Sequence, residues 1–217
     1  MSSLNAVRCL VTAGPTYEAI DPVRFIGNRS SGKMGIAIAE ELAIRGADVI
    51  LVLGPSTIPV SEKVRKIVRV ESSDEMYKAV HNEWTNCTIG IFAAAVADYK
   101  PKEVSEHKIK KNTSELTLEL VKTKDILHSI GQIKEVNQFL VGFALETNDE
   151  IENAKKKIVK KNLDLIVLNT LNDKGAGFQH DTNKITCIDK ENKITSFELK
   201  SKQEVAVDIV NYLEAKL

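Results

Sequence analysis

The sequence predicts an α/β domain of three layers, in which helices cover both faces of a mostly parallel sheet. Two observations support this prediction. Short apolar runs alternate with segments of helical periodicity along most of the chain, as in successive βαβ units. No internal repeat or low-complexity linker divides the 217 residues, and their hydrophobic content of 43% suits a globular core. We therefore expect residues 1–217 to form a single domain.

The amino-terminal half supplies four predicted strands and two predicted helices. Val7–Gly14 is apolar and ends in glycine, so we expect a buried strand there. A helix is expected over about residues 31–45, because Met34, Ile38 and Leu42 share one face and Gly46 can close its carboxyl end. The other predicted segments are strands at Asp48–Gly54, Lys66–Val70 and Ile89–Asp98, the last buried on both faces, and a helix from the Ser72–Glu75 capping box to about Trp84.

The regular pattern breaks after Asp98. Residues 99–115 are polar, rich in lysine and irregular, so we expect a flap there instead of core. The segments predicted beyond the flap are strands at Leu116–Leu120, Phe139–Glu146 and Leu163–Asn169, a short helix after Asp125, a helix over about 149–161, a hairpin of KITCID and KITSFEL, and a final helix opened by the capping box Ser201–Glu204. The predicted architecture is a Rossmann-like domain with a lysine-rich flap and a C-terminal hairpin plus helix.

Charge, cysteine content and hydropathy argue against several classes of protein. The 30 basic and 30 acidic residues balance, so the sequence predicts neither a nucleic-acid partner nor a membrane surface. Cys9, Cys87 and Cys187 are far apart and predict buried thiols in a reducing compartment. No signal peptide opens the sequence, and no apolar run approaches the ~18 residues of a membrane span. We expect a cytoplasmic protein.

The stretch Gly27–Gly35, with the sequence GNRSSGKMG, comes within one residue of a phosphate-binding P-loop. A P-loop has Ser or Thr after its lysine to help hold Mg²⁺, and Met34 offers only a thioether, a poor ligand for that cation. A P-loop also follows its strand directly, whereas the first predicted strand ends near Gly14. The apolar run that ends in Asp98 resembles a Walker B strand, so a P-loop phosphotransferase stays open as an alternative.

A dinucleotide-binding fingerprint fits the same stretch less well. Only G-x-x-G remains at Gly32–Gly35, and the second predicted strand ends in Gly-Pro-Ser where a ribose-binding acid would stand. Small residues at a helix start, here Ser30, Ser31 and Gly32, expose N–H groups and the positive end of the helix dipole to an anion. The segment therefore predicts either an anion site or a well-capped helix without a ligand. Together with Gly14, it is our candidate substrate and anion loop.

Five motifs, taken in order, resemble those of one enzyme family. They are TAGPT with YEAIDPVRFIGNRSSGKMG, then AAAVADYKP, HKIKK, VGFALET and KKNLDLIVLN. In order and spacing they are similar to phosphopantothenoylcysteine synthetase, also called phosphopantothenate–cysteine ligase, of coenzyme A synthesis. The resemblance covers nearly the whole chain. It does not include the flavin-dependent decarboxylase that is fused to many bacterial members, so it implies a free-standing synthetase without flavin, linked in function to a separate decarboxylase.

The resemblance implies a ligation in two steps. The carboxylate of 4′-phosphopantothenate attacks the α-phosphate of a nucleoside triphosphate, which releases pyrophosphate and leaves an acyl-nucleotide. The amine of L-cysteine then attacks the acyl carbon and gives 4′-phosphopantothenoylcysteine and a nucleoside monophosphate. Bacterial members typically use CTP with Mg²⁺, and the motif set is of that type. The resemblance also implies a homodimer with the pantothenate site near its interface, but it does not identify the metal ligands.

The family motifs imply three catalytic residues. Lys108 matches the flap lysine, whose ammonium would offset the repulsion between a carboxylate and a triphosphate while the closed flap excludes water. Lys110 and Lys111 add charge beside it. Asn28 matches an asparagine that holds the acyl-nucleotide, and Arg24 suits a carboxylate or phosphate contact. Without the other motifs, Lys108 would predict a solvated basic loop, Asn28 a turn residue and Arg24 a surface arginine.

A larger set of residues matches nucleotide-contacting positions of the family. Asp98 also suits a turn cap, and Phe143 also suits the core. Lys157 and Lys161 lie four residues apart, so both can face one phosphate-bearing cleft, although a solvated lysine-rich face is the alternative. The implied nucleotide-binding residues are Phe92, Ala93, Ala94, Asp98, Lys108, Thr123, Lys124, Asp125, Phe143, Lys157 and Lys161.

One segment departs from the family pattern. The family commonly has N-P-D-I where this sequence has Thr123-Lys124-Asp125-Ile126, so the aspartate is retained while the asparagine and proline are lost. Two other functions remain to be weighed against the ligase. A nucleotide-binding domain without catalysis is disfavoured by the presence of Asn28 and Lys108, and a P-loop phosphotransferase is disfavoured by Met34.

Overall fold

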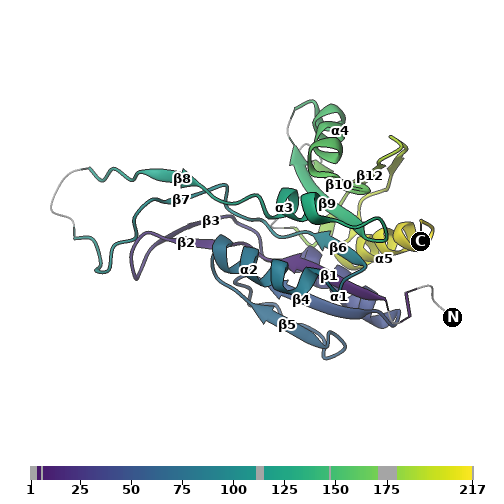
Figure 1. The fold of residues 1–217 in the computed structure, drawn as a ribbon, viewed down its shortest axis with the longest axis horizontal. Coiled ribbons are helices and arrows are strands. Elements are labelled where there is room, and N and C mark those ends of the chain that lie inside the picture. The colour runs from purple at the N-terminus through teal and green to yellow at the C-terminus, as the bar shows by residue number, and fades with distance from the viewer. Residues whose placement is uncertain (1–3, 6, 111–114, 147, 171–179, 217) are drawn as a thin grey trace.

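The centre of the molecule is an eight-stranded sheet (Figure 1). This computed structural model describes residues 4–5, 7–110, 115–146, 148–170 and 180–216. In spatial order the strands are β13 (Ile194–Ser196), β12 (Ile185–Asp189), β10 (Leu165–Thr170), β9 (Phe139–Glu146), β6 (Ile89–Phe92), β1 (Arg8–Ala13), β4 (Asp48–Leu53) and β5 (Lys66–Arg69). The run from β10 to β5 is parallel, while β12 pairs antiparallel with both β10 and β13. The predicted α/β class with a mostly parallel sheet is confirmed.

Helices cover both faces of this sheet and give the predicted three layers (Figure 1). On one face lie α1 (Lys33–Ile44) and α5 (Lys202–Glu214), and on the other lie α2 (Ser73–Trp84), α3 (Ile126–Ile133) and α4 (Glu150–Lys161). Each face has its own hydrophobic core. The first includes Ile38, Leu42 and Ile209, and the second includes Met76 and Ile130. The sheet is therefore buried on both sides, as its continuous apolar strands predict.

The helix boundaries follow the predicted capping chemistry. The capping boxes at Ser72 and Ser201 are present, and each serine side chain accepts a hydrogen bond from the backbone three residues later. Gly46 follows α1 with a φ of 92°, a conformation that favours glycine, and its N–H donates to Ala43 O at 3.1 Å. The start of α1 differs, because Gly32 caps it with a φ of 84° and no side-chain hydrogen bond. The N–H of Lys33, the first residue of α1, donates instead to Ser31 Oγ at 3.5 Å.

Two short hairpins project from the sheet and lie side by side (Figure 1). One joins β2 (Tyr17–Ala19) to β3 (Phe25–Gly27), and the other joins β7 (Tyr99–Pro101) to β8 (Leu120–Lys122). We call the described parts of 17–27 and 99–122 the arm. A third small pair, β11 (Thr182–Asn183) with β14 (Lys200–Ser201), lies before α5.

Two predicted strands end or begin elsewhere in the structure. The strand predicted to run to Asp98 ends at Phe92, because the chain then follows the segment after β1: Ala95 N donates to Gly14 O at 2.9 Å and Ala97 N to Thr16 Oγ1 at 3.0 Å. The strand predicted at Leu116–Leu120 is also wrong. Glu119 O accepts from Lys102 N at 2.9 Å, but pairing with β7 fixes strand geometry only from Leu120 onward.

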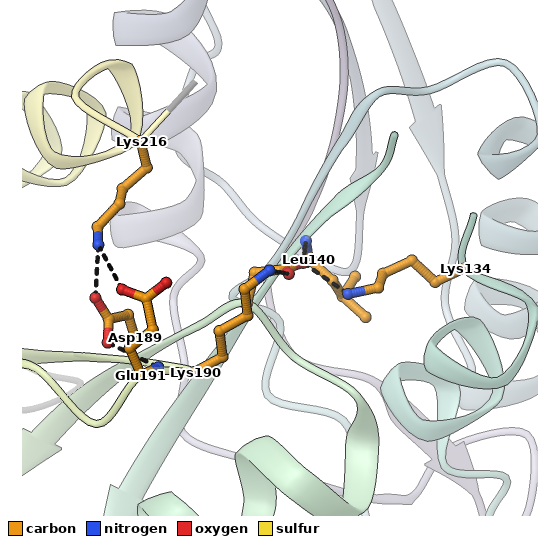
Figure 2. A network of polar contacts seen from close by, with 7 residues as sticks. Lys134, Leu140, Asp189, Lys190, Glu191 and Lys216 are labelled. Atoms are coloured by element: carbon orange, nitrogen blue, oxygen red, sulfur yellow. Dashed lines mark hydrogen bonds and ion pairs between the residues drawn. The ribbon is translucent and has the colours of Figure 1, made fainter. Parts of the chain in front are cut away.

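Ion pairs made by two buried carboxylates, Asp164 and Asp189, close the amino-terminal edge of the sheet. Asp164, which precedes β10, accepts from Leu140 N at 2.9 Å, from Lys134 Nζ at 2.7 Å and from Lys190 Nζ at 3.1 Å. Figure 2 shows Lys134 and Lys190 extending toward one another from opposite sides. Nearby, Lys216 beyond the end of α5 binds Asp189 at 2.7 Å. These pairs tie α5 and the β12–β13 turn to the sheet.

In the parts of the chain that the structure describes, every helix falls short of the length and apolarity needed to cross a bilayer.

Candidate active site

Two adjoining cavities lie at the carboxyl ends of the parallel strands, next to the segment that follows β6. The first has a volume of about 530 Å³ and the second about 380 Å³. Both fall within the usual range of roughly 300–1,000 Å³ for small-molecule sites. They share a wall, which consists of Ala94, Val96, Asp98 and Phe143. Ligands of parallel α/β sheets bind beyond this edge, so the position suits a binding site.

The first cavity contains most of the predicted nucleotide-binding residues. Asp125 caps α3 by accepting from His128 N at 3.0 Å, and it also accepts from Lys161 Nζ at 3.0 Å. Burial would raise the pKa of Asp125, but these two donors hold it below its ordinary value. Asp125 is therefore charged and already occupied by a helix cap and a lysine. The predicted residues that line this cavity are Phe92, Ala94, Asp98, Thr123, Lys124, Asp125, Phe143 and Lys161.

The segment that departs from the family pattern forms one rim of this cavity. Thr123 Oγ1 donates to Ala97 O at 2.6 Å, which ties the rim to the shared wall. The ammonium of Lys124 lies 4.7 Å from the centre of the Tyr77 ring, within the range of a cation–π contact. Lys122 contributes a further cation that sequence analysis did not single out. The rim is thus positive, apart from Asp125.

The second cavity lies against the start of α1. Its lining includes the predicted Asn28, Ser30, Ser31, Gly32, Ala93, Ala94, Asp98, Phe143 and Lys157. The side-chain nitrogen of Asn28 donates to Ala95 O at 3.0 Å and to Val96 O at 3.2 Å, which leaves the amide oxygen as the other polar end. Lys157 and Lys161, predicted to face one cleft, line different cavities on either side of the shared wall.

Glycines allow the loop before α1 to approach the end of β1 closely. Gly14 and Gly32 have φ angles of 83° and 84°, and a Cβ on Gly32 would lie 3.2 Å from the Gly14 backbone. Gly14 therefore supports the loop from behind and does not line either cavity. Met34 lines the second cavity and packs against the hydrophobic core, and its sulfur lies 3.9 Å from Asn183 Nδ2.

Arg24 and Lys108 are together on the arm and outside both cavities. The Arg24 guanidinium donates to Asp21 and, at 3.1 Å, to Ile109 O, next to Lys108. Lys108 itself is exposed, and neither residue lines either of these two cavities. The described structure thus brings two of the three predicted catalytic residues to one place and the third, Asn28, to another. Lys111 lies outside the described residues.

Several cavity residues escaped sequence analysis. They are polar or charged side chains from distant parts of the chain: Lys33, Asn169, Asn183 and Lys202 in the second cavity. Lys33 stands within the GNRSSGKMG motif, so its place there was a usable signal. Lys202 stands inside the capping box of α5, a motif that predicts a helix start and no ligand contact. Only the packing of α5 beside α1 brings Lys202 to the second cavity.

Among the described residues, no group of three or more His, Cys, Asp and Glu side chains could hold a metal ion. The cysteines are not part of the site. Cys9, Cys87 and Cys187 are buried, and burial raises the pKa of each thiol, to about 12 for Cys9 and Cys187 and to about 11 for Cys87. The three thiols are therefore protonated at neutral pH and unreactive.

The fold and the cavities define a Rossmann-like α/β protein with two adjoining cavities at the carboxyl edge of its sheet. The family model described as the DNA/pantothenate metabolism flavoprotein C-terminal domain matches residues 4–217. The chain belongs to this family.

Curated relatives and solved structures agree with this assignment. The chain is 44% identical to the coenzyme A biosynthesis bifunctional protein CoaBC of Bacillus subtilis over 98% of this chain and 52% of the relative. It is 54% identical to a protein of an unknown prokaryote named cysteine/cysteine sulfinic acid decarboxylase, over 95% of this chain and 58% of the relative. The chain therefore spans little more than half the length of these relatives. A crystal structure of the C-terminal domain of CoaBC has a TM-score of 0.83 and 43% identity, with 98% of each chain covered.

Proposed function

We propose that the chain is a phosphopantothenate–cysteine ligase that joins 4′-phosphopantothenate and L-cysteine through an acyl-cytidylate. CTP is consumed, and pyrophosphate and CMP are released. The observation that carries this proposal is the pair of adjoining cavities, which share Asp98 and Phe143. A reaction between two bound substrates needs neighbouring sites that hold the reacting groups together. The CoaBC relatives, matched over nearly the whole of this chain, support the proposal.

The charges of the two cavities suit two polyanionic substrates. Lys122, Lys124 and Lys161 line the first cavity, and Lys157 lines the second. Magnesium commonly binds through one or two carboxylates together with substrate phosphates, and Asp98 is the carboxylate common to both cavities. Asp98 would hold the ion, which would supply positive charge to the phosphates. Asn28 would contact the acyl-nucleotide, which requires its amide to turn away from the Ala95 and Val96 carbonyls.

The proposed homodimer accounts for the separation of Arg24 and Lys108 from the cavities. In this proposal the arm of one copy reaches the cavity of the other, so that Lys108 and Asn28 in one site come from different copies. Large exposed hydrophobic side chains on the arm support an interface there: Val23, Phe25, Tyr99, Val104, Leu116 and Leu120. Mixing Lys108→Ala protein with Asn28→Ala protein should then restore activity, because some mixed dimers contain one intact site. Absence of any recovery after subunit exchange would contradict the shared site.

The reaction test is the dependence of pyrophosphate release on each substrate. We expect release only when CTP, Mg²⁺ and 4′-phosphopantothenate are all present, and formation of the amide and CMP only when L-cysteine is added. Turnover with ATP should be lower than with CTP. Formation of CDP would instead indicate a phosphotransferase, and CTP binding without turnover would indicate a non-catalytic domain.

The decarboxylase name of the 54% identical relative is not part of this proposal, because the chain covers 58% of that protein. We propose that this chain acts as a ligase in the cytoplasm, linked in function to a decarboxylase, and that it binds no flavin itself. Incubation of the purified chain with L-cysteine alone tests the alternative, and release of carbon dioxide would count against the ligase assignment.

A further inference from the structure

The Asp98 carboxylate lies where the two cavities meet, because Asp98 belongs to the wall that they share. The residue is exposed, and among the described residues its carboxylate has no hydrogen-bond or ion-pair partner. Asp125, the other acid in the lining of these cavities, instead accepts from His128 N and from Lys161. Since no side chain holds the Asp98 carboxylate, its position depends on the backbone that carries it.

Two threonine hydroxyl groups hold this backbone. Ala97 N donates to Thr16 Oγ1 at 3.0 Å, and Thr123 Oγ1 donates to Ala97 O at 2.6 Å. Thr123 N also donates to Asp98 O at 3.0 Å. Thr16 and Ala97 are buried, so a hydrogen bond lost here would leave a polar group away from water. Together the three hydrogen bonds fix the peptide group before Asp98 and the one after it.

The contact with Ala97 O decides what the Thr123 side chain can do. A hydroxyl group has a single proton, and in Thr123 this proton is directed to the Ala97 carbonyl. Thr123 lines the first cavity, but its hydroxyl is left only as an acceptor for a ligand there. The donor of this side chain therefore serves the shared wall and not the ligand.

The same threonines lie at the roots of both hairpins of the arm (Figure 1). Thr16 directly precedes β2, Asp98 directly precedes β7, and Thr123 directly follows β8. Asn28, which directly follows β3, donates to two backbone carbonyls within residues 95–98. All four ends of the two hairpins thus meet at this short stretch. The position of Asp98 therefore depends on segments that are far apart in the sequence.

We propose that Thr16 and Thr123 are positioning residues, whose hydroxyl groups hold the Ala97 backbone and thereby keep the Asp98 carboxylate at the junction of the two cavities. The use of Asp98 in a reaction between two bound substrates rests on the proposed function. The threonines touch no reacting atom and act only through Asp98. Such support matters to a reaction, because a misplacement of about 1 Å can slow it by about 10²-fold.

A double-mutant cycle between Thr123→Val and Asp98→Asn tests whether the threonine acts through the acid. Valine removes the hydroxyl group and keeps the branched side chain, whereas the conservative Thr123→Ser keeps the hydroxyl group. Thr186→Val is the matched control, because the Thr186 hydroxyl pairs with Ser196 Oγ at 3.2 Å between β12 and β13 and lines neither cavity. The measurements are the rate of pyrophosphate release, the calorimetric dissociation constant of CTP with Mg²⁺, and Tm.

We expect Thr123→Val to slow pyrophosphate release by about 10- to 100-fold in the otherwise unsubstituted chain. In Asp98→Asn protein the same substitution should change the rate by about 2-fold or less, because the carboxylate that it would displace is already gone. The CTP dissociation constant should show the same non-additivity. Thr123→Ser should retain most of the rate, and Thr186→Val should leave it unchanged in both backgrounds. A purely structural role of Thr123 would lower Tm and give additive effects.

Thr16→Val should show the same coupling to Asp98→Asn from the other side of Ala97. Thermal unfolding identifies any variant that fails to fold. Thr16 is fully buried, whereas Thr123 is only partly buried, so the Thr123 variants decide the test. If Thr123→Val does not fold, Thr123→Ala replaces it in the cycle, because alanine removes the hydroxyl group without adding a methyl group.

Additive effects on both the rate and the CTP dissociation constant would overturn the positioning role, as would an Asp98→Asn protein that matches the unsubstituted chain in both measurements. The binding measurement separates this inference from the proposed function. A chain that forms no amide product but keeps the coupling in CTP binding would refute the ligase and support the positioning role. A chain that neither binds CTP nor releases pyrophosphate would overturn both.

Discussion

Asp21 holds Arg24 and the backbone beside Lys108 in one hydrogen-bond cluster. Asp21 Oδ1 accepts from the N–H groups of Val23 and Arg24, both at 2.9 Å. Asp21 Oδ2 accepts from Arg24 Nε at 3.0 Å and from Ile109 N at 3.1 Å, while the Arg24 guanidinium also donates to Ile109 O. The Asp21 side chain is fully buried. This carboxylate therefore joins the two hairpins of the arm.

Asp21→Asn should reduce the acid sensitivity of the protein. The Arg24 hydrogen bond, aided by backbone donors and opposed by burial, holds the pKa of Asp21 well below its ordinary value of 3.8. A carboxylate whose pKa is lower in the folded than in the unfolded chain stabilises the fold at pH values above its unfolded pKa. This stabilisation is lost progressively as the pH falls below about 4. We expect the Tm of Asp21→Asn to be lower at pH 7 and to fall less steeply toward pH 3. The exposed Glu62→Gln is the control, and parallel Tm curves for wild type and Asp21→Asn would contradict the expectation.

Lys108→Ala and Asn28→Ala should block different steps of the proposed reaction. Lys108 is exposed on the arm, so its loss should leave Tm nearly unchanged. Pyrophosphate release should slow by roughly 10²–10³-fold, the scale for removing one preorganised transition-state donor. Asn28→Ala should still release pyrophosphate in a first turnover, while amide formation lags behind. Rapid-quench assays of both products check this, and near-wild-type rates for Lys108→Ala would remove that residue from catalysis.

Met34→Ser should not improve affinity for Mg²⁺ or nucleotide. The thioether packs against the core and approaches Asn183, so a serine there loses packing and does not convert the loop into a P-loop. We expect calorimetric affinities for CTP with Mg²⁺ to be unchanged or lower, and Tm to fall modestly. A clear gain in Mg²⁺ affinity would restore the P-loop interpretation.

Asp164→Asn should destabilise the fold without changing the chemistry. The Lys134 side chain is 10% exposed and would keep a buried charge without its carboxylate partner. Breaking a buried ion pair in this way costs about 3–5 kcal/mol in the free energy of unfolding. The control Lys190→Ala removes a side chain that is 61% exposed and should cost about 1 kcal/mol or less. Urea denaturation measures the free energy of unfolding of both variants. Equal losses in Asp164→Asn and Lys190→Ala would show that Lys134 tolerates the loss of its carboxylate partner.

Local sequence patterns predicted most of the secondary structure. The apolar runs of β1, β4, β9 and β10, and the capping boxes of α2 and α5, are set by residues close together in the chain, and the structure confirms them. Periodicity and capping act over a few residues, so the sequence suffices for them. The family motifs also singled out Asn28, Asp98 and Phe143, and the structure places all three in the lining of the second cavity.

Tertiary structure decided what depends on contacts between distant segments. The strand after Ile89 ends at Phe92 because residues 93–97 bond to the segment after β1, and β8 begins at Leu120 because β7 pairs with it there. Lys202 reaches the second cavity only because α5 packs beside α1. In the same way, Asp21 accepts a hydrogen bond from Ile109 N, which lies 88 residues further along the chain. A pairing between remote residues leaves no periodic signal in either segment. The sequence by itself therefore determined the elements, while the packing of those elements determined which residues line the cavities.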